Sequence, residues 1–171
     1  MLYLLDANTL ITANNFYYPL EAVPEFWEWL QHVAAQGHVK MPLEIYEEIK
    51  EGPDEDKDPL FAWIQNPEVK KALLLDEAVH PDLVQAATVH GYAPDLSDTE
   101  LETVGRDPFL VAYAMANAGQ RMVVTAEVSK PKKQRANRKV PDVCGPMGVK
   151  WCTPFELNRA LGFRTNWKKM G

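Results

Sequence analysis

The sequence predicts an α/β protein, a three-layer α/β/α sandwich around a central, mainly parallel sheet. Short apolar runs such as residues 2–5, typical of strands buried on both faces, alternate with longer segments whose apolar residues recur at helical spacing. Short connections between alternating strands and helices favour parallel strands joined by crossovers. The length of 171 residues, 46% of them apolar, predicts one domain spanning residues 1–171.

The first half of the chain contains the predicted strand 2–5 and three predicted helices. Apolar residues at helical spacing predict a helix over residues 24–36, which Gly37 ends. The segment 42–51 begins at a proline and stops before Gly52, two signals of helix ends. The remaining elements predicted here are a strand at 39–41, an exposed acidic connection at 54–58, a helix at 59–65 and a short strand at 73–75.

The second half continues the alternation. Residues 109–118 are apolar nearly all round, so this helix is expected to be buried against the sheet. Gly162 marks the end of a last helix over residues 154–161. The other elements predicted here are helices at 81–90 and 98–103 and strands at 123–124 and 149–152.

Four acidic residues stand where predicted elements begin or end. Asp6 closes the first strand, and Asp107 opens the apolar helix. Glu48 lies in the helix 42–51, and Glu127 follows the strand 123–124. Because the carboxyl ends of neighbouring parallel strands share one crevice, this fold would bring the four carboxylates together. Carboxylates are the ligands that Mg²⁺ and Mn²⁺ prefer, so the pattern indicates a metal site.

Each acid also has an ordinary explanation. Asp107 precedes a proline and is suited to capping a helix. Glu48 would face water beside Glu44 and Glu47, although like charges four residues apart are unfavourable on an isolated helix. Asp6 would be a polar stop after its strand, and Glu127 an ordinary loop residue.

The order of these motifs resembles the PIN-domain ribonuclease family, and more narrowly a PIN-like branch known from bacterial genomes. The first motif is a strand ending in Asp6, then a small residue, Asn8 and an apolar pair. The second runs from Pro42 to Glu48, the third is an Ala-rich helix beginning with Asp107, and the last is Thr125 with an acid two residues later. Many relatives carry Asp where this chain has Glu127. The resemblance covers nearly the whole chain.

The resemblance implies a PIN-like fold and an Mg²⁺- or Mn²⁺-dependent endoribonuclease that leaves a 5′-phosphate and a 3′-hydroxyl. It implies Asp6 and Asp107 as principal metal ligands and Glu48 and Glu127 as direct or water-mediated ligands. Supporting polar groups that orient water or carboxylate are Asn8 and Thr125.

Kinship also implies a biological role. Small bacterial PIN proteins are commonly toxins, which implies RNA as substrate, a cognate antitoxin protein as partner, and a homodimer as a possible assembly. The alternative is a catalytically weak or inactive RNA-binding or scaffold module, because some PIN-like domains have lost acids.

A basic loop over residues 129–140 follows Glu127 in this acidic protein of net charge −6. Such a loop beside a carboxylate cluster would bind the phosphates of RNA. The alternative is a solvated, mobile surface loop. The basic residues of the loop are Lys130, Lys132, Lys133, Arg135, Arg138 and Lys139.

Other classes of protein fit less well. A haloacid-dehalogenase phosphatase would need a second Asp at the position of Asn8, where it serves as general acid. The four histidines lack zinc-hydrolase spacing, and Cys144 and Cys152 form no CxxC pair. The chain lacks a basic leader and a long apolar stretch, so we expect a cytoplasmic protein with no membrane partner.

Overall fold

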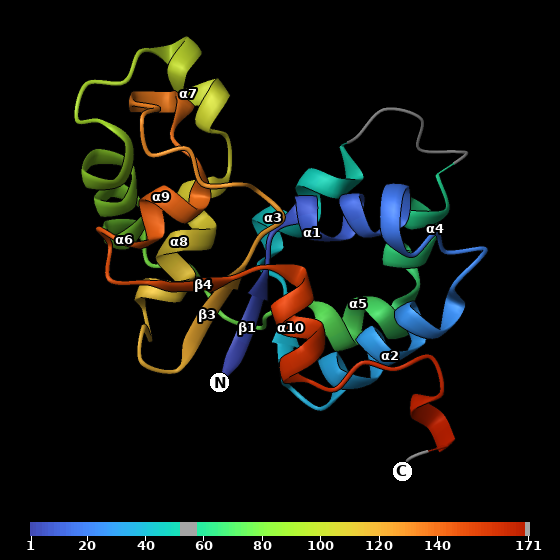
Figure 1. The fold of residues 1–171 in the computed structure, drawn as a ribbon. Coiled ribbons are helices and arrows are strands. Elements are labelled where there is room, and N and C mark those ends of the chain that lie inside the picture. Colours follow the sequence, from blue (N-terminus) through green and yellow to red (C-terminus); the bar gives the residue numbers. More distant parts are fainter. Residues whose placement is uncertain (52–57, 170–171) are drawn as a thin grey trace.

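A computed structural model describes residues 1–51 and 58–169. It confirms the predicted α/β fold, in which a four-stranded parallel sheet lies between layers of helices (Figure 1). The order across the sheet is β2-β1-β3-β4. The strands are β1 (Leu2–Leu5), β2 (Val39–Lys40), β3 (Arg121–Val124) and β4 (Lys150–Cys152).

Helices cover both faces of this sheet (Figure 1). One side carries α6 (Pro81–Ala86), α7 (Asp98–Val104), α8 (Asp107–Met115) and α9 (Val140–Cys144). The other side carries α2 (Pro24–Ala35), α4 (Pro59–Gln65), α5 (Pro67–Leu73) and α10 (Pro154–Ala160). Near the carboxyl ends of the strands lie α1 (Ala7–Thr12) and α3 (Leu43–Lys50). Two π-helical segments, Ala13–Tyr17 and Ala87–Tyr92, extend α1 and α6, and two 3-10 turns lie at Arg135–Asn137 and Trp167–Lys169.

The core forms where the central strands meet the helices. Leu4 and Leu5 of β1 and Val123 and Val124 of β3 have no exposed surface, as expected for strands covered on both faces. Most residues of α8 are buried, which confirms the prediction that this apolar helix is enclosed. The rigid centre of the molecule therefore lies directly beneath the ends of β1 and β3.

The register of β1 and β3 fixes the position of the first acid. Leu5 pairs with Val124, so the next residues, Asp6 and Thr125, leave the sheet as neighbours. The Asp6 amide also donates to the Val124 carbonyl oxygen at 2.9 Å. The sheet itself thus brings together two side chains that are far apart in the sequence.

Several local predictions were wrong. Residues 73–75 are not a strand, because Leu73 ends α5 and only Leu74 bridges to Met41. The helix α5 was missed, although Asn66 caps it and Pro67 begins it. The short helices α1 and α9 were also missed. Residues 54–57 of the predicted acidic connection lie outside the described residues.

Within the described residues, no helix combines the length and the apolar character needed to cross a membrane. Cys144 and Cys152 are both buried and free.

Candidate active site

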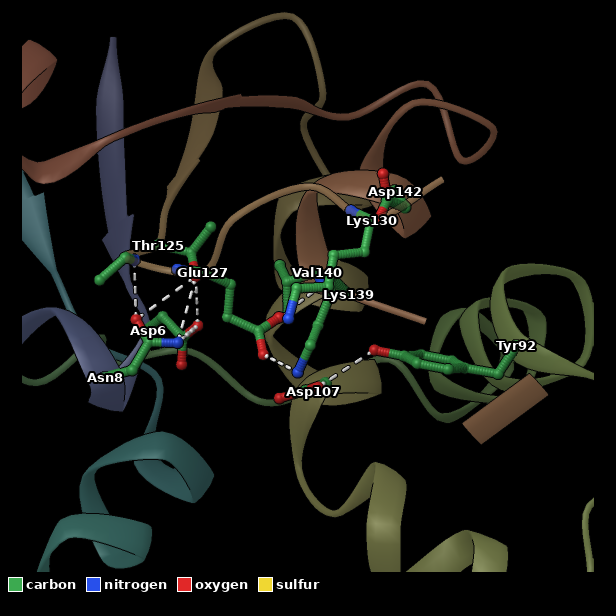
Figure 2. A network of polar contacts seen from close by, with 11 residues as sticks. Asp6, Asn8, Tyr92, Asp107, Thr125, Glu127, Lys130, Lys139, Val140 and Asp142 are labelled. Carbon is green, nitrogen blue, oxygen red and sulfur yellow. Dashed lines mark hydrogen bonds and ion pairs between the residues drawn. The ribbon is translucent and has the colours of Figure 1, made fainter. Parts of the chain in front are cut away.

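Asp6 is held by the two polar residues that were predicted to support it. Its side chain is buried, with 3% of its surface exposed. Its Oδ2 accepts hydrogen bonds from Asn8 Nδ2 at 2.6 Å and from Thr125 Oγ1 at 2.7 Å (Figure 2). Asn8 Oδ1 in turn accepts from the Ala126 amide at 2.8 Å, which fixes the Asn8 side chain across the ends of β1 and β3. The orientation of the Asp6 carboxylate is therefore set by the backbone of both strands.

Asp107 lies at the first position of α8, half-buried. Arg106, not Asp107, occupies the cap position of this helix, and no side-chain hydrogen bond caps it. Instead, Asp107 Oδ2 accepts from Tyr92 Oη at 3.2 Å (Figure 2). The helix-cap explanation of this acid is therefore wrong, and the carboxylate is directed to the site rather than to its own backbone.

Glu127 anchors the end of the basic loop. Its Oε1 accepts from Lys139 Nζ at 2.8 Å and its Oε2 from the Val140 amide at 2.8 Å (Figure 2). Glu127 is half-buried, and both of its carboxylate oxygens accept hydrogen bonds that hold the end of the loop in place.

Glu48 is the most exposed of the four acids. Its helix, α3, is held against the start of α8 by Arg106, the residue before Asp107. The Arg106 guanidinium donates to the Glu44 carbonyl oxygen at 2.9 Å and to the Glu51 carboxylate at 2.7 and 2.8 Å. This bridge holds the segments of Glu48 and Asp107 together.

The pKa values show that the four acids share one electrostatic environment. Burial and, to a lesser degree, the charges of Glu48 and Glu127 raise the pKa of Asp6 to about 7, although hydrogen bonds from Thr125 and Asn8 oppose the shift. Burial also holds the pKa of Asp107 well above its usual range, with contributions from Asp6, Glu127 and Glu48. Partial loss of hydration raises the pKa of Glu48, although Arg106 lowers it. Burial is the largest cause of each shift, and the charges of neighbouring acids add to it for Asp6 and Asp107.

One ammonium group offsets part of this charge. The pKa of Lys139 is raised, chiefly by its hydrogen bond to Glu127 and further by the charges of Asp107 and Asp6. Figure 2 shows the Lys139 side chain reaching between Glu127 and Asp107. Lys139 thus stands where a cation is electrostatically favoured.

The side chains fit a hard divalent cation in their chemistry. The available groups are carboxylate, amide and hydroxyl oxygens, which Mg²⁺ and Mn²⁺ favour, and the crowded negative charge would be relieved by such an ion. Among residues 1–51 and 58–169, no three His, Cys, Asp or Glu side chains form a ready-made ligand cluster. Asp6 and Glu127 direct carboxylate oxygens to protein donors. The carboxylates available to such an ion are those of Asp6, Asp107, Glu48 and Glu127.

The basic loop divides into two groups of residues. Arg135 forms ion pairs with Asp95 and Glu100, and Arg138 donates to the carbonyl oxygens of Gly91 and Asp142. In the described part of the chain, the side chains of three exposed lysines make no hydrogen bond or ion pair, namely Lys130, Lys132 and Lys133. The two arginines therefore hold the loop in place, whereas these lysines are open to a ligand.

Two contributors to the site were not predicted. Tyr92, the hydrogen-bond donor to Asp107, ends a π-helical segment, and no local pattern marks it. Arg106 had a possible signal in its position directly before Asp107. Its partners are Glu44 of α3 and Glu51 directly after that helix, both more than fifty residues away in the sequence, so the contact could not be predicted.

Comparison with known proteins assigns the chain to a family. A search of curated protein sequences finds no match. The family described as "Domain of unknown function (DUF4411)" matches residues 3–165, which includes all four acids and the basic loop. The match extends over nearly all of the chain, and the protein therefore belongs to the DUF4411 family.

Proposed function

We propose that this protein is a metal-dependent endoribonuclease of the PIN-like type that hydrolyses RNA phosphodiester bonds. The observation that carries the proposal is the mutual charge of the acids. Four separate chain segments supply Asp6, Glu48, Asp107 and Glu127, and the charges of the other three add to the effect of burial in raising the pKa of Asp107. Such repulsion destabilises the metal-free fold and would be relieved by a bound cation, and clustered acids with shifted pKa values are typical of functional sites.

Bound Mg²⁺ or Mn²⁺ would orient a water for in-line attack and neutralise charge on the phosphate and the departing oxygen. The residues around the site keep its groups in fixed orientations. Asn8 and Thr125 hold one oxygen of Asp6, and Tyr92 holds one oxygen of Asp107. Such support is what a reactive geometry needs, because small displacements of a ligand are costly in rate.

RNA fits the surroundings of the carboxylates. A hollow of about 290 Å³ is lined by Asp107 and Glu127 together with Lys130, Lys133 and Lys139. Ammonium groups on the wall of a carboxylate site attract a polyanion and hold its phosphate beside the acids. RNA would therefore meet positive charge beside the acids, although the net charge of the whole protein is −6.

A catalytically weak RNA-binding or scaffold module is the second candidate. The pairing of Glu127 with Lys139 favours it, because an ammonium group already neutralises one of the proposed ligands. Cleavage assays separate the two candidates, because both predict RNA binding and only the first predicts metal-dependent hydrolysis.

The resemblance to small bacterial PIN proteins further supports a toxin role, with a cognate antitoxin as protein partner and a homodimer as the assembly. A neighbouring reading frame whose product relieves growth inhibition by this chain would support that role. Absence of growth inhibition on expression would remove the toxin proposal and leave the nuclease proposal standing.

The test of the nuclease proposal is cleavage of unstructured RNA with Mg²⁺ or Mn²⁺. We expect Asp6→Asn and Asp107→Asn each to lower the rate by more than about a hundredfold, beyond the effect of losing a supporting residue. Each variant keeps the size of the side chain and removes its charge. Glu48→Gln is expected to be severely impaired and Glu127→Gln less so.

The matched control is Asp82→Asn, which removes the charge of an exposed Asp in the first turn of α6. Near-normal turnover by Asp6→Asn or Asp107→Asn at saturating metal would contradict the assignment.

A further inference from the structure

A second cavity, of about 430 Å³, adjoins the carboxylate site. It is lined by residues from α1 and its π-helical extension, from the segment after β3 and from α10. Glu127 lines both this cavity and the basic hollow that contains Asp107. Whatever enters the cavity therefore lies next to the proposed reaction centre.

The cavity has an aromatic rim and an apolar floor. Tyr17 and Phe155 are 52% and 43% exposed, and their rings meet edge to face with centroids 4.9 Å apart. Leu10 and Leu157 are buried in the floor. Exposing two aromatic rings beside an apolar cavity costs free energy in water, so the arrangement indicates a ligand with a flat apolar surface.

Several polar side chains also line the cavity, and Asn158 is one of them. Asn158 is 9% exposed and lines the cavity. Its Nδ2 donates to Tyr18 Oη at 3.4 Å, a long hydrogen bond. Among the described residues, no group donates to Asn158 Oδ1, so this oxygen is available to a donor on a ligand. The cavity thus offers a flat apolar surface and a polar contact at its wall.

We infer that this cavity binds one unpaired nucleobase of a single-stranded RNA whose phosphates contact the neighbouring lysines. The inference rests on the proposed nuclease function and specifies its substrate as unpaired RNA. Recognition of single-stranded RNA commonly combines stacking of bases on aromatic rings with hydrogen bonds to base edges. Tyr17 and Phe155 supply aromatic rings for stacking, and Asn158 supplies a hydrogen-bonding group for the base edge.

The path of the chain favours a nucleobase over an apolar side chain of a protein partner. Val128 and Ser129 line the cavity, and Lys130, Lys132 and Lys133 follow directly. A nucleotide has the same sequence of groups, with a flat base joined to a charged phosphate. An apolar peptide segment would gain from the cavity but not from Lys130 and Lys133, which line the hollow that shares Glu127 with it.

The experiment measures binding of short single-stranded RNA to the intact protein in the presence of a chelator, which prevents cleavage. A set of oligonucleotides carries one abasic site at successive positions. For wild type, we expect an abasic site at one position to weaken binding by about tenfold, within the range found for stacked bases. A fluorescent adenine analogue at that position should be quenched on binding.

Matched variants locate the base. Tyr17→Ser and Phe155→Ser should bind intact RNA about as weakly as wild type binds the abasic strand. Both side chains are exposed at the rim, so the fold should be retained. Phe16→Ser is the control, because Phe16 is 75% exposed but does not line the cavity. Asn158→Leu should change which base is preferred at the sensitive position.

Failure of this inference differs from failure of the nuclease proposal. If wild type cleaves RNA but Tyr17→Ser and Phe155→Ser bind both strands as wild type does, the cavity takes no base. A protein segment would then be the remaining occupant. If the abasic effect depends on the cavity while no divalent ion supports cleavage, base binding stands and the nuclease proposal fails.

Discussion

Asp6 follows Leu4 and Leu5, the two fully buried residues of β1, so its carboxylate loses water when the chain folds. Hydrogen bonds from Asn8 and Thr125 recover part of this loss, but Glu48 and Glu127 add like charge. The result is a pKa of about 7 in the folded protein. The metal-free fold is therefore destabilised by negative charge that the surrounding protein groups do not fully neutralise. A divalent cation would neutralise this charge and stabilise the fold.

This environment predicts how the stability of the metal-free protein depends on pH. Between about pH 4 and about pH 7, the folded state keeps a proton on Asp6 that the unfolded state has lost. The free energy of unfolding should therefore fall as pH rises through this window, by up to about 1.4 kcal/mol per pH unit for one proton. Below the window both states are protonated, and above it both are ionised.

Urea unfolding in a chelator, repeated across this pH range, measures the effect. Asp6→Asn should have a shallower pH dependence than wild type and should be at least as stable near neutral pH, because it removes a charge that is costly in the fold. Asp82→Asn serves as the exposed control. Equal slopes for wild type and Asp6→Asn would mean that Asp6 titrates normally.

The loop 129–140 shows how one element combines structural and binding roles. Asp142 accepts hydrogen bonds from Ser129 and from the Lys130 amide, while Glu127 holds Lys139 and Val140. Both ends of the loop are thus fastened beside the site. Arg135 adopts a φ of 54°, unusual for a residue with a side chain, and its ion pairs with Asp95 and Glu100 support that conformation.

The division within the loop predicts different effects on RNA binding. Lys132→Ala and Lys133→Ala should each reduce the slope of log affinity against log salt by about 0.7, as expected for one lost contact to a single strand. Arg135→Ala should leave that slope nearly unchanged, because its guanidinium already pairs with Asp95 and Glu100. Titrations at several salt concentrations measure the slopes. A larger change for Arg135→Ala than for the lysine variants would reverse the assignment.

Elements with strong local signals were predictable from the sequence. These local signals are the all-apolar run of β1, the prolines that begin α2 and α10, and the apolar surface of α8. The short helix α1 was not predictable, because its Asn and Thr residues are weak helix formers and its position depends on the strand before it. The strand error at residues 73–75 arose because a buried helix end and a buried strand have the same apolar pattern.

The site was predictable to the extent that it depends on topology. Asp6 lies beside Thr125 because β1 and β3 are parallel neighbours with Leu5 opposite Val124. The partners of the acids depend instead on contacts between distant segments. Lys139 was predicted as a phosphate-binding residue and is paired with Glu127, and Tyr92 reaches Asp107 from a different helix. Such pairings follow from how helices pack, which the spacing of residues along the chain does not reveal.

The site is assembled from segments that lie far apart in the sequence. The sheet supplies Asp6 and Thr125, α3 supplies Glu48, and α8 supplies Asp107. Arg106 joins the start of α8 to α3 through hydrogen bonds to Glu44 and Glu51. Because the acids repel one another in the metal-free fold, binding of an ion should stabilise the entire domain rather than one loop.

Thermal unfolding with and without Mn²⁺ or Mg²⁺ tests this central claim most directly. An ion that binds only the folded state should stabilise wild type by about 2.7 kcal/mol at a hundred times its dissociation constant. We expect the melting temperature of wild type and of the Asp82→Asn control to rise together, and the rise to shrink greatly in Asp6→Asn and Asp107→Asn. If divalent ions shift the melting of all four proteins equally, the four carboxylates do not form one metal site.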